Sequence, residues 1–254
     1  MSEERSGKEL KEMGFLDHLE ELRWRIIKSL LSVLLFAVIA FLFSDVFIEL
    51  LVKPIKEINP AVKFQVLKVQ GILVLKLWIA FALGIAFSIP VIIYQIWAFV
   101  SPGLYEHEKK WVPWLFIGVT GFFIIGAVFA YFVIIPFAVR FLTSLGIEDV
   151  EKNISINYYA KFVMQLILAS GILFQMPVLS FILTKVGLIS PMTLKKYWRH
   201  AVVVILVLAA FITPPDPVSM IMMGIPLFFL YEFSILISKI AYKPVEEDAE
   251  SPAG

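Results

Sequence analysis

The chain has 254 residues, of which 60% are hydrophobic, and a mean hydropathy of +0.88. Because soluble domains hold about 45–50% apolar residues, this composition excludes a soluble globular protein and indicates an integral membrane protein. The formal net charge of +1 gives no global attraction to nucleic acid, and the lack of cysteine excludes disulfides, thiolate chemistry and cysteine-ligated metal.

The N-terminal part, residues 1–25, is polar and charged and lacks the apolar core and cleavage site of a secretory signal. We therefore expect the first apolar run to remain as a membrane anchor, preceded by a flexible cytoplasmic N-terminus over residues 1–14. From Phe15 to Ile26 the apolar residues recur at helical spacing, which predicts an amphipathic helix just before the first span. Glu21 either pairs with Arg25 one turn later or faces the other charged segment at the same membrane surface.

Charge-free apolar runs predict six transmembrane helices, and they are Ser29–Ser44, Leu77–Tyr105, Trp111–Val139, Phe162–Thr184, Ala201–Pro215 and Pro217–Tyr231. A helix needs about 20 apolar residues to cross a bilayer, and the second, third and fourth runs are long enough. The last two predict short helices of only about 22 Å each. The segment 213–217, Thr-Pro-Pro-Asp-Pro, cannot continue a helix and predicts a tight extracytoplasmic turn between them.

These runs predict an all-α polytopic fold, with a six-span membrane domain over residues 15–242 embedded in the lipid bilayer. If the N-terminus is cytoplasmic, fourteen Lys and Arg side chains fall on that side and eight on the other. The positive-inside rule then predicts that both termini are cytoplasmic. The external segments 47–70 and 140–160 are expected to be structured caps, and the acidic residues 243–254 a disordered cytoplasmic tail.

The polar segment between the second and third runs, residues 99–111, carries five charged or titratable residues in succession from Glu106 to Lys110. Ser101 and Pro102 before them are typical of a helix start, which predicts a short helix along the membrane surface. The simpler interpretation is a polar loop.

No cluster typical of a hydrolase, a transferase or a metal site is present, and the three His residues stand far apart in the sequence. We expect no enzymatic activity, no catalytic residue, no metal and no cofactor. A secondary transporter of a small solute is the alternative. It would normally bury several coupling carboxylates, whereas only Gln165 and Gln175 stand deep in the apolar runs.

Gln175 stands one residue before the Met176-Pro177 helix break. Its side chain either satisfies backbone carbonyls freed at that break or binds a polar residue in the helix of a partner protein.

Five motifs, in order along the chain, resemble the TatC family, the six-span receptor subunit of the twin-arginine protein translocase. They are His18-Leu-Glu-Glu21-Leu-Arg23, the segment Pro90–Phe99, the segment Pro102–Glu108, Ala130-Tyr131-Phe132 and Thr213-Pro-Pro-Asp216. The resemblance extends from about Phe15 to Tyr242.

The resemblance implies that Glu21 and Glu108 are the cytoplasmic carboxylates that receive the paired arginines of a signal peptide. Arg23, Phe99 and Pro54 fall on family positions that are sensitive to change, and we expect Arg23 and Phe99 to belong to the signal-peptide site with Glu21 and Glu108. The resemblance further implies folded cargo proteins, small single-span partners of the TatA and TatB kind, an oligomeric complex, and export driven by the proton-motive force across the inner membrane of a prokaryote.

Three features depart from the family pattern, all at positions linked to partners or structure rather than to the signal peptide. Gln175 stands where the family often has Glu, and Met220 stands where Gln is common after the Pro-Pro-Asp216 motif. Val69-Gln70-Gly71 replaces an acidic motif in the first external segment. Gln175, Pro54 and Asp216 are therefore expected to have structural or partner-binding roles, whose details in this chain can differ from the family's.

Overall fold

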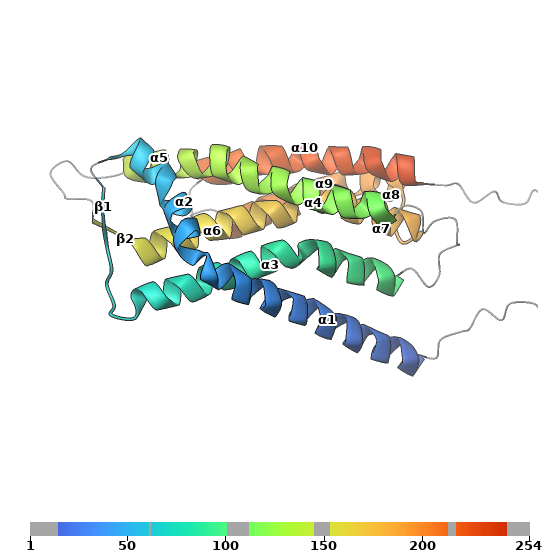
Figure 1. Cartoon of the computed structure of the whole chain (residues 1–254). Helices are drawn as coiled ribbons and strands as arrows, with labels where there is room; N and C mark the ends of the chain where they lie inside the picture. The colour runs from blue at the N-terminus through green and yellow to red at the C-terminus, as the bar shows by residue number, and fades with distance from the viewer. Residues whose placement is uncertain (1–14, 61, 101–111, 145–152, 213–216, 243–254) are drawn as a thin grey trace, which may run out of the picture.

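The computed structural model describes residues 15–60, 62–100, 112–144, 153–212 and 217–242 (Figure 1). The elements in chain order are α1 (Phe15–Leu42), α2 (Ser44–Ile58), β1 (Lys63–Gln65), α3 (Gly71–Val100), α4 (Val112–Phe129), the π-helical turn η3 (Ala130–Ile134), α5 (Ile135–Ser144), β2 (Asn153–Ser155), α6 (Ile156–Leu173), α7 (Met176–Lys185), α8 (Pro191–Lys196), α9 (Trp198–Ile212) and α10 (Pro217–Ala241). The predicted surface helix after Ser101, the predicted turn at 213–216 and both predicted tails lie outside these ranges.

Five helical segments within the described ranges are long and apolar enough to cross a membrane, namely His18–Leu42, Gly71–Phe99, Phe116–Ser144, Ile156–Lys185 and Met223–Ala241. A shorter apolar helix, Trp198–Phe211, accompanies them. The helical membrane fold is therefore as predicted, while a sixth crossing by the short helix stays a prediction.

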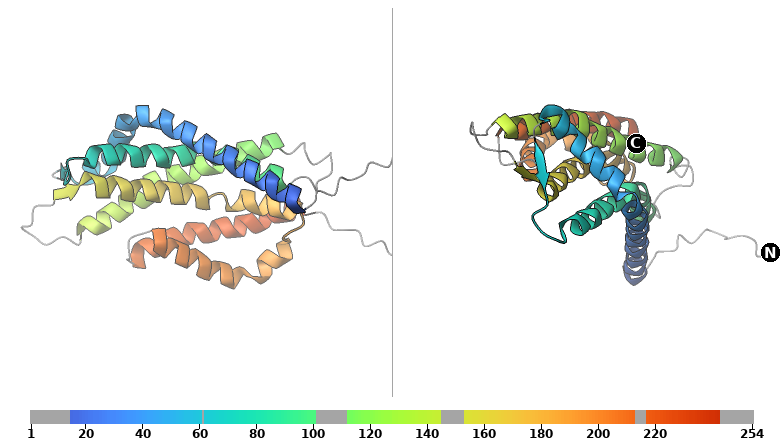
Figure 2. Two further views of the ribbon diagram at one scale, coloured as in Figure 1. Left: turned by 90° about the horizontal axis from the view of Figure 1, so that it is seen from below. Right: turned by 60° about the vertical axis from the view of Figure 1, so that its left-hand side comes forward.

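The last helix corrects the sequence prediction. α10 is one helix of 25 residues, so the expected short helix ending at Tyr231 was wrong, whereas α9 is short with 15 residues. The charge-free run ended at Glu232, but this side chain is exposed and the helix continues through a second apolar stretch to Ala241. Seen from below, α9 and α10 turn back before the far end of the bundle (Figure 2).

The first helix also differs from the expectation. The predicted amphipathic helix and the first span are a single helix, α1, of 28 residues. α1 packs chiefly on α3, and its outer side chains stay uncovered, with Leu34 61% exposed. A Cβ atom on Gly84 of α3 would lie 2.7 Å from both Ala37 Cβ and Val33 O of α1, so the two backbones approach closely at this point.

The bundle has two distinct ends. At one, the terminal end, α1 begins and α3 and α10 finish, close to α8 (Figure 1). At the other, the sheet end, lie α2, α5 and the strands. β1 and β2 pair in parallel, with Lys63 opposite Asn153 and Gln65 opposite Ser155, and so join the two predicted external caps. Apart from these two strands of three residues each, the regular secondary structure of the described residues is helical.

Small residues allow α4 and α6 to cross at close range. Ser170 Oγ donates a hydrogen bond to Gly126 O at 2.9 Å. A Cβ on Gly126 would lie 2.8 Å from Phe174 Cγ and 2.8 Å from Ser170 O, and 2.9 Å from Gly171 Cα. Helices in lipid gain packing energy where glycine and serine let their backbones come together.

A π-helical turn joins α4 to α5 within one long apolar segment. The extra residue of the π-turn rotates the helix that follows. π-turns inserted in α-helices are frequently found at functional sites. In this turn Tyr131 donates its hydroxyl to Leu50 O of α2 at 3.0 Å, which fastens the long helix to the cap at the sheet end.

Gly126→Ala is expected to destabilise the protein by about 1–3 kcal/mol, because the new methyl group meets backbone atoms that cannot move aside. Gly118→Ala on the same helix is the control, since no atom lies within 4 Å of its Cβ position. That change should be neutral or stabilising by up to about 1 kcal/mol from helix propensity. Thermal unfolding in detergent, followed by helical circular dichroism, measures both. An equal or higher midpoint for Gly126→Ala would contradict the close crossing.

Candidate functional site

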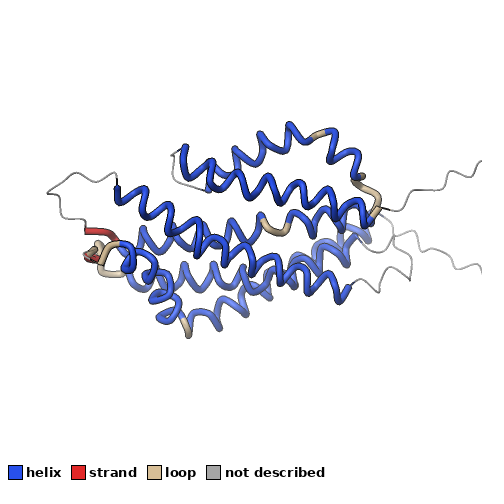
Figure 3. The backbone as a smooth tube through the Cα atoms, turned by 90° about the horizontal axis from the view of Figure 1, so that it is seen from above, coloured by secondary structure: helices blue, strands red, loops and turns tan. Residues whose placement is uncertain are grey.

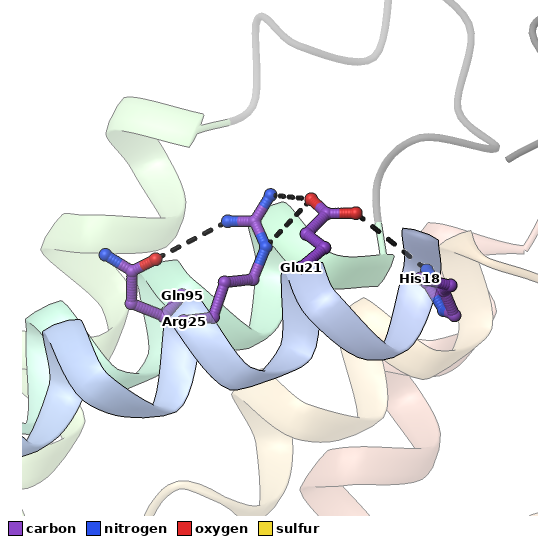
Figure 4. Close-up of polar contacts among 4 residues, drawn as sticks. All are labelled: His18, Glu21, Arg25 and Gln95. Carbon is purple, nitrogen blue, oxygen red and sulfur yellow. Dashed lines mark hydrogen bonds and ion pairs between the residues drawn. The ribbon is translucent and has the colours of Figure 1, made fainter. Parts of the chain in front are cut away.

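A polar cluster lies at the terminal end, where the first turns of α1 meet the last turns of α3 (Figure 4). α1 supplies His18, Glu21 and Arg25, whose spacing of three and four residues puts them on one face of the helix. α3 supplies Gln95 and Phe99, again one turn apart. Two helices that are far apart in sequence therefore present their polar faces to each other.

Arg25 connects the two helices. Its Nε donates to Glu21 Oε1 at 3.0 Å, and its Nη2 also contacts that oxygen. Its Nη1 donates to Gln95 Oε1 at 3.4 Å, across to α3 (Figure 4). The side chains of Glu21 and Arg25 are each only 20% exposed. The predicted pairing of Glu21 with Arg25 is thus confirmed, and Gln95 completes it.

The second oxygen of the Glu21 carboxylate has a different environment. Oε2 is buried and has no hydrogen-bond partner among the described residues, and His18 Nδ1 lies 3.8 Å from it. A buried carboxylate oxygen without a donor costs free energy, so a further donor that reached Oε2 would be stabilising.

The ring of Phe99 stacks on the His18 imidazole and forms one boundary of the site. The His18 and Phe99 rings lie 4.2 Å apart between centroids, with an angle of 15° between their planes. Phe99 is half-buried at the end of α3. The ring contact positions the imidazole beside Glu21 and fixes the first turn of α1 against α3.

The other residues expected at the site are not all brought together. Arg23 is exposed and, two residues after Glu21, projects from a different face of α1. Pro54 is buried in α2 at the sheet end, remote from Glu21. Glu108 and Asp216 lie outside the described residues. Gln95 and His18 were not predicted to join the site, although Gln95 was one of few polar residues in an apolar run.

Gln175 occupies the break between α6 and α7, which Figure 3 shows as a short loop between helical segments. It is 3% exposed, and its Nε2 donates to Val119 O at 3.1 Å and to Gly171 O at 3.3 Å. Of its two predicted alternatives, the satisfaction of backbone carbonyls near the break is therefore observed. Its Oε1 is buried without a partner among the described residues, and a contact with another protein stays a prediction.

The arrangement of charged side chains at the cluster limits the chemistry that it can perform. Within the described ranges, no three His, Asp or Glu side chains gather as a metal site would require. What the cluster can do is recognise a cation, because it combines a carboxylate held in place by Arg25, a second carboxylate oxygen without a hydrogen-bond donor among the described residues, and the aromatic ring of Phe99.

Comparisons with known proteins all point in one direction. The family model of the Sec-independent protein translocase protein (TatC) matches residues 17–226. A TatC protein of Helicobacter pylori is 41% identical over 235 residues, which cover 92% of this chain and 90% of that protein. A TatC protein of Aquifex aeolicus is 37% identical over 237 residues, covering 92% and 98%. A crystal structure described as the twin-arginine translocase receptor TatC superposes with a TM-score of 0.78 at 38% identity, covering 88% of this chain and 99% of that one.

Gln175→Leu removes two donated hydrogen bonds between the α6–α7 break and neighbouring carbonyls. We expect it to lower the stability by roughly 1–2 kcal/mol, measured as the unfolding midpoint in detergent. Gln165→Leu is the matched control, because Gln165 is an exposed glutamine on α6 and should tolerate an apolar side chain. Equal midpoints for the two variants would show that the buried amide contributes nothing to the fold.

Proposed function

The chain belongs to the TatC family of Sec-independent protein translocase proteins, and from that premise we propose that it is the receptor subunit for twin-arginine signal peptides. The observation that supports this most directly is the Glu21 carboxylate, of which Oε1 is paired with Arg25 while Oε2 has no hydrogen-bond donor among the described residues. A signal-peptide arginine would supply that donor.

The chemistry of the cluster fits an arginine better than a lysine. A guanidinium presents a planar fork of donors, which matches a carboxylate and stacks against an aromatic ring, and an ammonium does neither. A charge-assisted hydrogen bond at a partly buried site contributes roughly 1.5–3 kcal/mol. Arg25 keeps the Glu21 carboxylate oriented, so the incoming guanidinium meets an acceptor that is already in place.

A second carboxylate is needed to explain a requirement for two arginines, and we propose Glu108 for that role. α3 ends at Val100 and α4 begins at Val112, and both of these points lie at the terminal end, where α1 also begins (Figure 1). The chain between them therefore starts and finishes at the same end of the bundle as the Glu21 cluster.

In this proposal the terminal end faces the cytoplasm and the sheet end faces outward, across the inner membrane of a prokaryote. The excess of Lys and Arg in the segments assigned to the inside supports this orientation. Folded proteins with paired-arginine signals would dock at the terminal end. Single-span partners of the TatA and TatB kind would then assemble beside the receptor for export driven by the proton-motive force, with Gln175, Pro54 and Asp216 as candidate contacts or supports.

Glu21→Gln and Glu108→Gln should each weaken the binding of a twin-arginine peptide by about tenfold or more, because about 1.4 kcal/mol of binding free energy corresponds to that factor. Isothermal titration with the purified full chain in detergent measures the dissociation constants. A peptide with Lys-Lys in place of Arg-Arg should bind poorly to the unmodified protein and lose much less on either substitution.

Glu20→Gln is the matched control for this series, because Glu20 is exposed on the same turn of α1 and lies on a different face from Glu21. It should bind the peptide with nearly unchanged affinity. Unchanged affinity in the Glu21→Gln and Glu108→Gln double variant, with helical circular dichroism intact, would show that the arginines are recognised elsewhere.

The orientation has its own test, since the chain contains no cysteine. We expect a cysteine at Lys56, exposed on α2 at the sheet end, to react with a membrane-impermeant maleimide added to intact cells. A cysteine at Lys239, exposed near the end of α10, should react only after the inner membrane is opened. Labelling of both positions from the same side would refute the proposed topology.

A further inference from the structure

A cavity of about 200 Å³, lined by two lysines, lies at the sheet end, remote from the Glu21 cluster. The turn before α3 forms one wall with Lys68 and Gln70, and the start of α6 forms the other with Asn157, Tyr158 and Lys161. These walls precede or begin the apolar segments Gly71–Phe99 and Ile156–Lys185. The cavity is therefore at the level where the chain enters the membrane.

The walls of the cavity are fixed by direct contacts. Asn157 Nδ2 donates to Gly71 O at 3.0 Å, which ties the first turn of α6 to the start of α3. A Cβ on Gly71 would lie only 2.8 Å from Val66 Cγ1 and 3.0 Å from Asn157 Nδ2, so this close approach depends on glycine. The pairing of Gln65 with Ser155 holds the two chain segments together immediately before they reach the cavity.

The charged side chains that line the cavity among the described residues are all positive. Lys68 and Lys161 line it, and no carboxylate does so among the described residues. Two other lysines at this end are paired with carboxylates: Lys76 forms an ion pair with Asp45 at 2.7 Å, and Lys53 lies 3.9 Å from Glu57. Neither Lys68 nor Lys161 takes part in an ion pair found within the described ranges. Two cations thus line one cavity, and none of the described residues places a carboxylate there.

An apolar stripe leads from the cavity into the membrane. Val74, which lines the cavity, is followed along α3 by Trp78 and Phe81, a spacing that places all three on one face of the helix. Their exposed fractions are 41%, 40% and 55%. The Lys161 ammonium lies over the Trp78 ring, 5.3 Å from its centroid. A lysine of the cavity therefore contacts an aromatic residue of the apolar stripe.

We propose that this cavity is a binding site for an anionic phospholipid, with the phosphate between Lys68 and Lys161 and an acyl chain along Val74, Trp78 and Phe81. Basic pockets between transmembrane helices bind anionic headgroups on the cytoplasmic side of membranes, and lysines at the membrane surface would attract a phosphate in the same way at this end. The stripe distinguishes a lipid from a free phosphate, since a soluble anion would make no use of it.

Native mass spectrometry of the purified full chain in detergent tests the site, with dioleoyl phosphatidylglycerol compared against dioleoyl phosphatidylcholine. The anionic lipid should be retained at collision energies that remove the neutral one, which has the same acyl chains. Lys68→Gln and Lys161→Gln should each lower the apparent affinity for phosphatidylglycerol about fivefold, and the double variant more. Lys63→Gln is the matched control, since Lys63 is exposed on β1 and does not line the cavity.

Conservative variants and a soluble competitor complete the design. Lys68→Arg combined with Lys161→Arg should restore retention of phosphatidylglycerol, which shows that charge and not misfolding is responsible. Wild-type retention in the double glutamine variant, or an equal loss in Lys63→Gln, would overturn the site. Displacement of the lipid by an equal concentration of glycerol 3-phosphate would overturn the lipid assignment, because it would identify a small soluble anion as the ligand.

Discussion

Hydrocarbon offers no hydrogen-bond partner, and this constraint organises the polar groups of the whole bundle. Several small polar side chains that face the interior donate to carbonyls of another helix, as Ser170 does to Gly126 O. Farther along, Ser180 donates to Ser234 O at 3.0 Å, and the hydroxyls of Thr184 and Ser238 lie 2.7 Å apart. These contacts fasten α6 to α4 and α7 to α10 in a medium where apolar side chains alone would give no preference for helix over lipid.

The same constraint bears on the proposed binding site, because a partly paired carboxylate at the membrane edge favours a cationic ligand. A carboxylate at the membrane edge is costly unless it is paired, and Arg25 pairs only one oxygen of Glu21. The second oxygen, Oε2, has no hydrogen-bond donor among the described residues and can still accept one. Binding energy at such a site comes from supplying the missing donor, which favours a ligand with a delocalised, multiply donating cation.

The sequence predicted what depends on local pattern and missed what depends on contact. Long apolar runs indicated α3, α4 and α6, and the four-residue spacing of Glu21 and Arg25 indicated their pairing. The end of α10 was misplaced because one charged residue, Glu232, was taken as a boundary although an exposed face tolerates it. The strands were missed because three residues carry no periodicity. The contact of Arg25 with Gln95 spans 70 positions, and no spacing rule connects them.

The close approach of α1 and α3 at Gly84 has a mechanical consequence. Ala37, which touches that glycine position, stands sixteen residues after Glu21, or about 24 Å along the helix axis. α1 packs chiefly on α3, so the contact acts as a fulcrum, and the Arg25–Gln95 and His18–Phe99 contacts hold the arm that carries the carboxylate against α3. A tilt of about 5° at the fulcrum displaces Glu21 by about 2 Å, close to the difference between a made and a broken hydrogen bond.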